Sequence, residues 1–303
     1  MELTWLTTFR TVAEAGNFTR AAERLHLTQP AVSGHVQALE ADLGVPLFDR
    51  SGRTIRLTQA GERVYRYASR IGGLLEDCRR ELADLSEGTT GYAAVGATDT
   101  LTAFFLPDVL GRFRRTHPGV AIRLHTGLTE GLVDALIQDR LDLAVVPDPG
   151  PHPGLERLPL LELELAAVLP PDHPLASASS VDVRDLALQP LVLYERGCMY
   201  RGRLEQAWVE TGRFPETITE LGSLEGIRRS VVAGLGLSVL PLVAVEADGR
   251  AGTLVVKPLA GVDPRIHVVL ALHAGRYRPG PVRALLSELT AGRAAPLGTG
   301  GQA

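Results

Sequence analysis

The chain has 303 residues, a formal net charge of −4 and two cysteines. This length provides for two or three domains with cores of their own. No run of about 18 apolar residues and no charged-then-apolar leader occurs, so we expect a cytoplasmic protein that neither spans a membrane nor is exported. Two cysteines are too few for a disulfide framework and lack the spacing of a metal site, so no metal or other cofactor is expected.

Three helices are predicted within residues 1–45. The apolar face of the first is formed by Leu3, Leu6, Phe9, Val12 and Ala13. Asn17 is the expected N-cap of the second helix, in which Ala21 and Ala22 allow a close helix crossing. Thr28 is the expected N-cap of the third helix, where Pro30 in the first turn loses no helical hydrogen bond.

The third helix has two contrasting faces. Its apolar stripe consists of Val32, Val36, Leu39 and Leu43, and the opposite arc consists of Pro30, Ser33, Gly34 and Gln37, with Gln29 at its edge. Small hydrogen-bonding side chains suit a helix that enters the major groove of DNA. An ordinary buried helical hairpin is the alternative, but it would need neither this face nor the arginine-bearing wing that follows.

A long helix is predicted next, from Thr58 as N-cap to about Glu87. Apolar residues recur at intervals of seven at Val64, Ile71, Cys78 and Leu85, and the second set of this heptad seam is Tyr67, Ala68, Leu74, Leu75 and Leu82. Such a stripe needs a partner, so the helix is interpreted as a dimerisation element. Within it, Cys78 is interpreted as a packed small side chain rather than a redox group.

Residues 87–91 form a break, after which strand and helix patterns alternate. The predicted order is strand 93–96, helix 101–116, strand 120–125, helix 129–139 and strand 141–146; then strands 163–169 and 191–194, helices 199–212 and 225–233, and strands 237–240 and 266–272 with helix 281–290. This pattern indicates an α/β region with a mostly parallel sheet, arranged as two lobes joined by two crossings. The tail after about residue 292 is expected to be disordered.

The run from Phe18 to Gly61, with AAERLHLTQPAVSGHVQALE, LGVPLFDR and LTQAG, resembles the winged helix-turn-helix of LysR-type transcriptional regulators. The resemblance implies base contacts from Gln29, Pro30 and Ser33, with Thr28 and Gln37 nearby. It implies phosphate contacts from Thr19, Arg20, Arg50, Arg53 and Thr58. Gly34 and His35 depart from the family, which often has longer polar side chains there.

The resemblance also implies the architecture of the whole chain. An N-terminal all-α winged helix-turn-helix (1–58) and a long linker helix with hinge (59–90) precede an α/β two-lobed, periplasmic-binding-protein-like effector domain (91–292). Its first lobe is expected at about 91–160 and 266–292, and its second at about 161–265. Residues 1–58 contain six arginines and six acidic residues, so the DNA-binding domain has no net charge. We therefore expect several copies to contribute phosphate contacts with operator DNA together, in a homodimer or in a homotetramer built as a dimer of dimers.

Four turns are expected to converge on the cleft between the lobes, where helix N-termini offer free N–H groups to a small-molecule effector. Candidate ligand contacts are Thr98, Thr100, Thr126, Cys198 and Ser223. The alternative is that the Thr and Ser residues among them merely cap helices. The expected effector is a carboxylate, although Asp99 at the mouth would oppose an anion and leaves a mixed or amino-bearing head group open.

Cys198 supports two hypotheses. A helix N-terminus and the neighbouring Arg196 and Arg201 should lower its pKa and favour the thiolate, as in the peroxide-sensing members of the family that the segment YERGCMYRGRLEQ resembles. No second cysteine follows in this segment to resolve a sulfenic acid. The segment also resembles the GC-x-YR-x-RLE run of metabolite-sensing members of the family, similar to the glutamate- and citrate-pathway regulators. Metabolite sensing is therefore preferred over cysteine oxidation.

Two other classes of protein are disfavoured. A solute-binding protein would share the clamshell but not the DNA-binding head. An enzyme would need a catalytic motif, and GxSxG, HExxH and GxxxxGK are all absent from the sequence.

Overall fold

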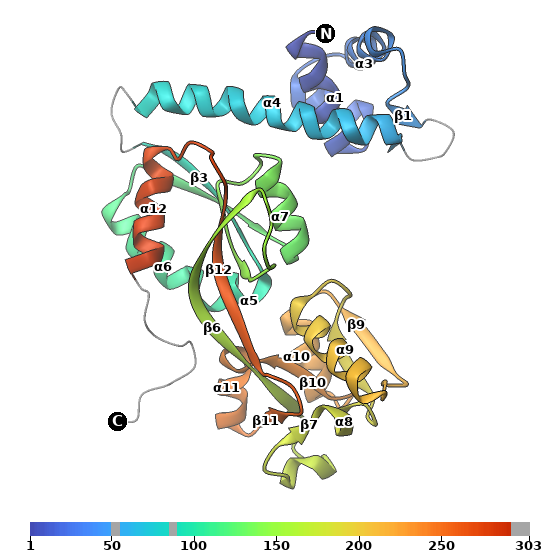
Figure 1. The fold of residues 1–303 in the computed structure, drawn as a ribbon, viewed down its shortest axis with the longest axis vertical. Helices are drawn as coiled ribbons and strands as arrows, with labels where there is room; N and C mark the ends of the chain where they lie inside the picture. The colour runs from blue at the N-terminus through green and yellow to red at the C-terminus, as the bar shows by residue number, and fades with distance from the viewer. Residues whose placement is uncertain (50–54, 85–89, 292–303) are drawn as a thin grey trace. The chain divides into compact units, whose positions relative to one another are not determined.

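The computed structural model describes residues 1–49, 55–84 and 90–291 (Figure 1). The chain divides into two compact units, Met1–Ser86 with Gln138–Arg140, and Glu87–Ile137 with Leu141–Ala303. Each is described by itself below. Arg50, Arg53, Leu85 and the predicted disordered tail lie outside the described residues. Within the described ranges, no helix combines the length and apolar composition that a membrane crossing requires.

The first unit begins with the three predicted helices, α1 (Leu3–Ala15), α2 (Phe18–Leu25) and α3 (Gln29–Leu43). Both predicted N-caps are confirmed: the Asn17 side chain accepts hydrogen bonds from the N–H groups of Thr19 and Arg20, and the Thr28 hydroxyl accepts one from that of Ala31. The core is built from Leu6, Phe9, Val12, Ala21, Ala22, Val32, Val36, Leu39, Leu47, Phe48 and Ala68. Leu3 was wrongly placed on this face, because the first turn of α1 leaves it 52% exposed.

A short wing and the long helix follow. Strands β1 (Phe48–Asp49) and β2 (Arg56–Leu57) pair antiparallel, and the Glu40 carboxylate fixes the base of the wing by accepting the N–H groups of Leu47 and Phe48. Helix α4 (Gln59–Asp84) starts at the predicted cap, Thr58, whose hydroxyl accepts the N–H of Gly61 at 3.0 Å. Gly61 has no room for a side chain, because a Cβ would lie 2.0 Å from the Leu47 carbonyl oxygen.

The predicted seam of α4 is divided between two environments. Val64, Ala68 and Ile71 pack against the core of the first unit, so the expectation that they face a partner is wrong. The remaining apolar positions are exposed: Tyr67 at 65%, Leu74 at 65%, Leu75 at 41% and Leu82 at 62%, together with Cys78. We call these five residues the exposed stripe of α4.

The second unit holds the sensor. Its helices are α5 (Asp99–Phe104), α6 (Leu106–Thr116), α7 (Thr129–Ile137), the 3-10 turn η1 (Pro174–Ser177), α8 (Val183–Leu186), α9 (Met199–Thr211), α10 (Leu224–Val232), α11 (Leu242–Ala251) and α12 (Gly280–Ala291). Its strands are β3 (Gly91–Ala97), β4 (Val120–Thr126), β5 (Leu143–Pro147), β6 (Leu155–Leu169), β7 (Val181–Asp182), β8 (Leu191–Tyr194), β9 (Ile218–Leu221), β10 (Ser238–Pro241), β11 (Val255–Ala260) and β12 (Arg265–His273).

The sheet is mixed, which corrects the expectation of a mostly parallel one. Strand β3 pairs parallel with β4 and β5, and β8 pairs parallel with β9. However, β12 runs antiparallel to β5 and β6, and β10 and β11 run antiparallel to β6. The cause is β6, which was predicted at less than half its 15 residues and serves both lobes.

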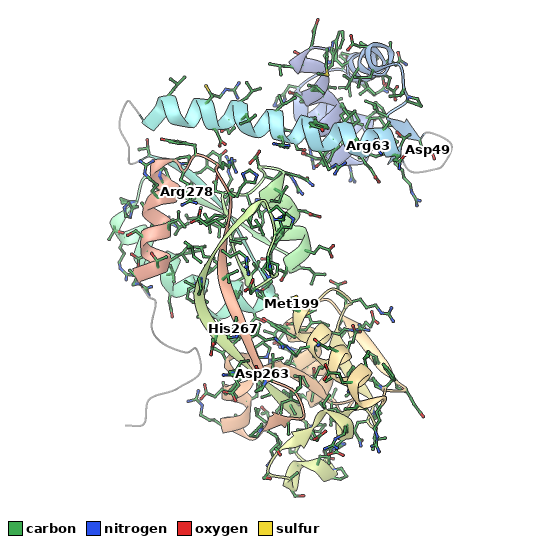
Figure 2. The ribbon with its side chains drawn as sticks, in the orientation of Figure 1. Asp49, Arg63, Met199, Asp263, His267 and Arg278 are labelled. Atoms are coloured by element: carbon green, nitrogen blue, oxygen red, sulfur yellow. The ribbon has the colours of Figure 1, made fainter. Side chains whose placement is uncertain are left out.

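Two crossings join the lobes, as expected. Lobe I contains β3–β5, α5–α7 and α12, and lobe II contains β7–β11 and α8–α11; β6 runs through both and β12 returns the chain to lobe I (Figure 1). The crossing segments touch where the N–H of Leu165 donates to the Pro264 carbonyl at 2.8 Å. His267 on β12 lies close to this crossing (Figure 2).

Several elements were missed or merged by the sequence patterns. The predicted helix 101–116 is two helices, because Pro107 in the first turn of α6 cannot continue the hydrogen-bond ladder of α5. Strands β7, β9 and β11 and helices α8 and α11 were not predicted. Two of the missed strands are only two and four residues long, too short for a clear alternation.

Candidate functional site

The outer face of α3 is open to solvent, as a base-reading helix requires. Gln29, Pro30, Gly34 and Gln37 are exposed and Ser33 is half-buried. The Gln29 side-chain amide donates to the Ser33 hydroxyl at 3.0 Å, so these two side chains form one hydrogen-bonding unit. A side chain added at Gly34 would meet no atom within 4 Å. The face is therefore shallow and free for contact.

Residues around this face have different roles. Thr19, Arg20 and Thr28 are exposed beside it. His35 instead turns toward α1, where its Nδ1 lies 3.0 Å from the Thr8 hydroxyl, so it holds two helices together. Thr58 donates its hydroxyl to the Pro46 carbonyl at 2.8 Å, a local contact that a phosphate would have to share.

In the sensor unit, one cavity of about 230 Å³ collects all five predicted effector contacts, Thr98, Thr100, Thr126, Cys198 and Ser223. They come from four separate turns, at the ends of β3, β4, β8 and β9. Met199, at the start of α9, lines the same cavity (Figure 2). Arg196, which was expected near Cys198, does not line it.

The capping alternative holds for only one of the three threonines and the serine in this set. The Ser223 hydroxyl accepts the N–H of Gly226 at 3.1 Å and thus caps α10. Thr98 precedes α5 without a side-chain cap bond, and the Thr126 hydroxyl lies 3.3 Å from that of Thr102. Capping therefore does not explain why these side chains gather here.

Four buried hydroxyls define the chemistry of the cavity. Those of Thr98, Thr100, Tyr194 and Tyr200 are inaccessible to solvent and make no hydrogen bond of ordinary geometry within the described part of the chain, although Thr100 lies close enough to both phenols to oppose in part the rise of their pKa. Thr100 is 1% exposed, Tyr200 4% and Tyr194 7%. Burial raises the pKa of both tyrosines, so both phenols stay protonated and can donate. A buried hydroxyl without a partner costs free energy that a bound ligand would recover.

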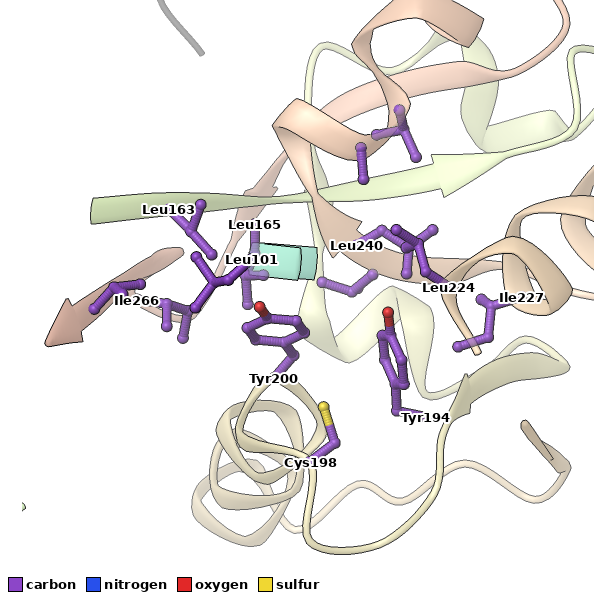
Figure 3. Packing of buried hydrophobic residues seen from close by; sticks show 14 of the residues in the cluster. Leu101, Leu163, Leu165, Tyr194, Cys198, Tyr200, Leu224, Ile227, Leu240 and Ile266 are labelled. Carbon is purple, nitrogen blue, oxygen red and sulfur yellow. The ribbon is translucent and has the colours of Figure 1, made fainter. Parts of the chain in front are cut away.

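The two tyrosines were not recognised from the sequence. They flank Cys198 at either side of the turn from β8 to α9, and in Figure 3 their hydroxyls and the cysteine sulfur point the same way. Their rings lie edge to face with centroids 5.9 Å apart. The only available signal was the repetition of tyrosine around that turn, which is equally typical of core packing.

Cys198 is not the activated thiol that the sequence suggested. It is 9% exposed, and burial raises the pKa of its thiol, with the N–H groups of Arg201 and Tyr200 and the charge of Arg201 opposing that rise only in part. Gly197 makes the preceding turn possible with φ of +92°. The expectation of a lowered pKa is therefore wrong.

Arg201 has a structural role in lobe II. It is 3% exposed, and its guanidinium contacts Glu205 at 2.7 Å, Glu220 at 2.9 Å and the Tyr194 carbonyl at 3.0 Å. These bonds tie α9 to β8 and β9. The charge of Arg201 is thus directed at two carboxylates and at the backbone that positions Tyr194.

Charged groups at the cavity are acidic. Asp99 and Glu195 are among its lining residues, and no Lys, Arg or His is found among them in the described part of the chain. The Asp99 carboxylate accepts the backbone N–H of Leu224, the first residue of α10, at 3.0 Å. The cavity therefore presents hydroxyls, helix N-termini and apolar walls, and its charged side chains are acidic.

Comparison with known proteins agrees with both units. Residues 3–62 match the family model "Bacterial regulatory helix-turn-helix protein, lysR family", and residues 86–294 match "LysR substrate binding domain". The chain is 33% identical to a probable RuBisCO transcriptional regulator of Trichormus variabilis over 289 residues, covering 92% of this chain and 85% of the relative.

Two solved structures are similar over nearly the whole chain. Full-length OxyR from Pseudomonas aeruginosa is 31% identical, with a TM-score of 0.70 and coverage of 95% of this chain and 94% of that one. Full-length CbnR complexed with its target DNA is 25% identical, with a TM-score of 0.66 and coverage of 95% and 99%. The chain therefore belongs to the LysR-type transcriptional regulators, a family of DNA-binding regulators and not of enzymes.

Proposed function

We propose that this regulator binds operator DNA through the outer face of α3 and changes that binding when a small polar metabolite occupies the sensor cavity. The observation that carries the proposal is the group of three nearly inaccessible, unpartnered hydroxyls, of Thr100, Tyr194 and Tyr200, in a cavity between two lobes. The proposal includes the division into residues 1–58, 59–90 and 91–292, with the lobe limits expected from the sequence. It also places the protein in the cytoplasm, where operator DNA lies.

Base reading is assigned to Gln29, Pro30 and Ser33, with Thr28 and Gln37 nearby. Phosphate contacts are assigned to Thr19, Arg20, Arg50, Arg53 and Thr58. In support, Gln29 and Gln37 are exposed on α3 and carry side-chain amides, which can pair with the edge of adenine.

We expect Gln29→Ala to weaken specific operator binding by about 1 to 3 kcal/mol and to leave nonspecific binding nearly unchanged. Ser33→Ala should behave similarly. Because Gln29 bonds to Ser33, the double variant should lose less than the sum of the two single losses. Arg20→Ala is the control and should weaken binding to all sequences and reduce the salt slope. Gel-shift titrations in which Gln29→Ala loses specific and nonspecific binding equally would contradict the assignment.

Dimerisation is assigned to the exposed stripe of α4, and a dimer of dimers is the proposed operator-binding form. The support is the row of exposed apolar side chains, since such a continuous stripe is typical of an interaction surface.

The proposed effector is a small carboxylate or a metabolite with a mixed head group. Helices α7, α9 and α10 begin at the cavity, and helix N-termini attract anions. The hydroxyls of Thr98, Thr100, Tyr194 and Tyr200 would satisfy further polar groups of the ligand.

Thr100→Val tests the cavity directly. It removes a buried unpartnered hydroxyl while preserving shape, so the free protein should gain about 1 kcal/mol in unfolding free energy and an effector should bind about 1 to 3 kcal/mol more weakly. Urea unfolding followed by the fluorescence of the buried Trp208 measures the first effect. Thr211→Val is the control and should lose stability, because its hydroxyl donates to the Ala207 carbonyl. A stability loss in Thr100→Val would mean that the hydroxyl is already satisfied.

Peroxide sensing through Cys198 is the second candidate, suggested by the similarity to OxyR. The raised pKa of the buried thiol argues against it, because the thiolate is the reactive form. The other cysteine, Cys78, lies in α4 of the first unit and not in the sequence segment that holds Cys198. We therefore favour metabolite sensing.

A further inference from the structure

The sensor cavity contains an unusual contact between its two lobes. Asp99 opens α5 in lobe I, and its Oδ2 accepts the N–H of Leu224, which opens α10 in lobe II, 125 residues further along the chain. Leu224 is 7% exposed and Asp99 is half-buried, so this contact is partly screened from water. A carboxylate from one lobe therefore caps a helix of the other.

The Asp99 carboxylate occupies a position that favours the binding of an anion. The first turn of a helix presents unpaired N–H groups and a partial positive charge. Ser223 satisfies the N–H of Gly226 and Asp99 satisfies that of Leu224, so two of the donors at this end of α10 already have partners from the protein. A ligand carboxylate could reach the Leu224 amide only by displacing Asp99.

A second observation shows that this end of α10 faces a binding site. The hydroxyls of Thr100 and Tyr200 line the same cavity, are more than nine-tenths buried and make no hydrogen bond of ordinary geometry in the described part of the chain. The cavity is thus built for a polar occupant. No Lys, Arg or His among its described lining residues would offset the charge of Asp99.

We propose that the Asp99 carboxylate occupies the anion-binding position at the N-terminus of α10 and so competes with a ligand anion for it. In the empty sensor, Asp99 thereby holds the two lobes together. It also selects against effectors that would place a second negative charge at this position. This inference rests on the proposed function and specifies how its site discriminates. The favoured occupant meets the hydroxyls with neutral or amino groups, and a carboxylate binds at the N-terminus of α10 only at the cost of displacing Asp99.

The contact itself is tested on the full-length protein without any effector. Hydrogen exchange at the Leu224 amide, followed by mass spectrometry with fragmentation, should accelerate at least tenfold in Asp99→Ala and by less in Asp99→Asn, whose side-chain oxygen can still accept. Glu195→Gln is the matched control, because Glu195 lines the same cavity but is not the acceptor of the Leu224 N–H. It should leave the exchange unchanged. Equal exchange at Leu224 in all four proteins would overturn the proposal.

The competition is tested with inorganic sulfate as the probe, and sodium chloride at equal ionic strength as reference. Sulfate should raise the thermal unfolding midpoint of Asp99→Ala by several degrees more than that of the wild type or of Glu195→Gln. An equal response of all three would overturn the proposal, as would a response of Glu195→Gln as large as that of Asp99→Ala, which would indicate a general charge effect.

The two proposals can fail separately. Operator gel shifts should be alike for all variants without effector if the DNA-binding unit is intact. If Thr100→Val shows no stability gain while Leu224 exchange still depends on Asp99, the effector site is wrong and the interlobe contact stands. If hydrogen exchange at Leu224 is independent of Asp99 and Thr100→Val gains stability as expected, only the proposed role of Asp99 is wrong.

Discussion

Replacing Leu74 and Leu82 together with aspartate is expected to convert the dimer into a monomer and to reduce operator affinity about a thousandfold, to near the nonspecific level. Both side chains are more than 60% exposed in the single chain, so the change should cost little in folding. In a dimer each chain would bury two carboxylates without partners, which costs several kcal/mol. A head that reaches only one half-site then loses most of its specific affinity.

Sedimentation velocity measures the particle mass and a gel shift measures the affinity. Arg66→Asp is the control, because Arg66 is exposed on the same helix about 100° around the axis from Tyr67. It should leave the mass unchanged. Ile71 is not used, because it packs against the core of its own unit and its replacement would confuse folding with assembly. An unchanged mass in the Leu74, Leu82 variant would reject the stripe as the dimer contact.

The first unit could be predicted almost residue by residue, because its signals are local. The caps at Asn17, Thr28 and Thr58 and the apolar spacing of α3 each involve residues within one or two turns. The prediction that Leu3 is buried was wrong, because apolar periodicity does not show which turns of a helix extend beyond the core. The environment of Ile71 also depended on tertiary packing, which sequence spacing does not contain.

The sensor was predicted as two lobes with two crossings but with the wrong sheet. Strand direction depends on pairing between distant segments, and β6 pairs with β12 about 100 residues later. The half of β6 that pairs with β12, residues 155–164, is only partly buried and carries charged side chains, so its sequence showed no clear strand pattern.

In the candidate site, too, features set by local sequence could be predicted and features set by tertiary packing could not. Turns that follow strands could be recognised, and they brought Thr98, Thr100, Thr126, Cys198 and Ser223 into one cavity. Tyr194 and Tyr200 were missed, because a buried tyrosine has the same sequence signature as core. The pKa of Cys198 was misjudged, because the sequence shows a helix start and arginines but not the burial that outweighs them.

Cys198→Ser is expected to retain effector-dependent transcription in full, because a metabolite sensor needs the turn and its N–H groups rather than a thiolate. A peroxide sensor needs the thiolate itself, so the same substitution would eliminate its response entirely. The raised pKa of the buried thiol predicts the first outcome. In the folded protein an aromatic disulfide reagent should likewise modify the exposed Cys78 before Cys198.

The measurement is reporter transcription in cells that carry the wild type, Cys198→Ser or Thr100→Val, with and without a peroxide pulse. The wild type should show no peroxide response, and Thr100→Val should lose sensitivity to the effector while Cys198→Ser keeps it. The two variants lie in the same cavity but remove different chemistry, a hydrogen-bonding hydroxyl in one and a sulfur in the other. A peroxide response that disappears in Cys198→Ser and persists in Thr100→Val would replace metabolite sensing with cysteine oxidation as the function of the cavity.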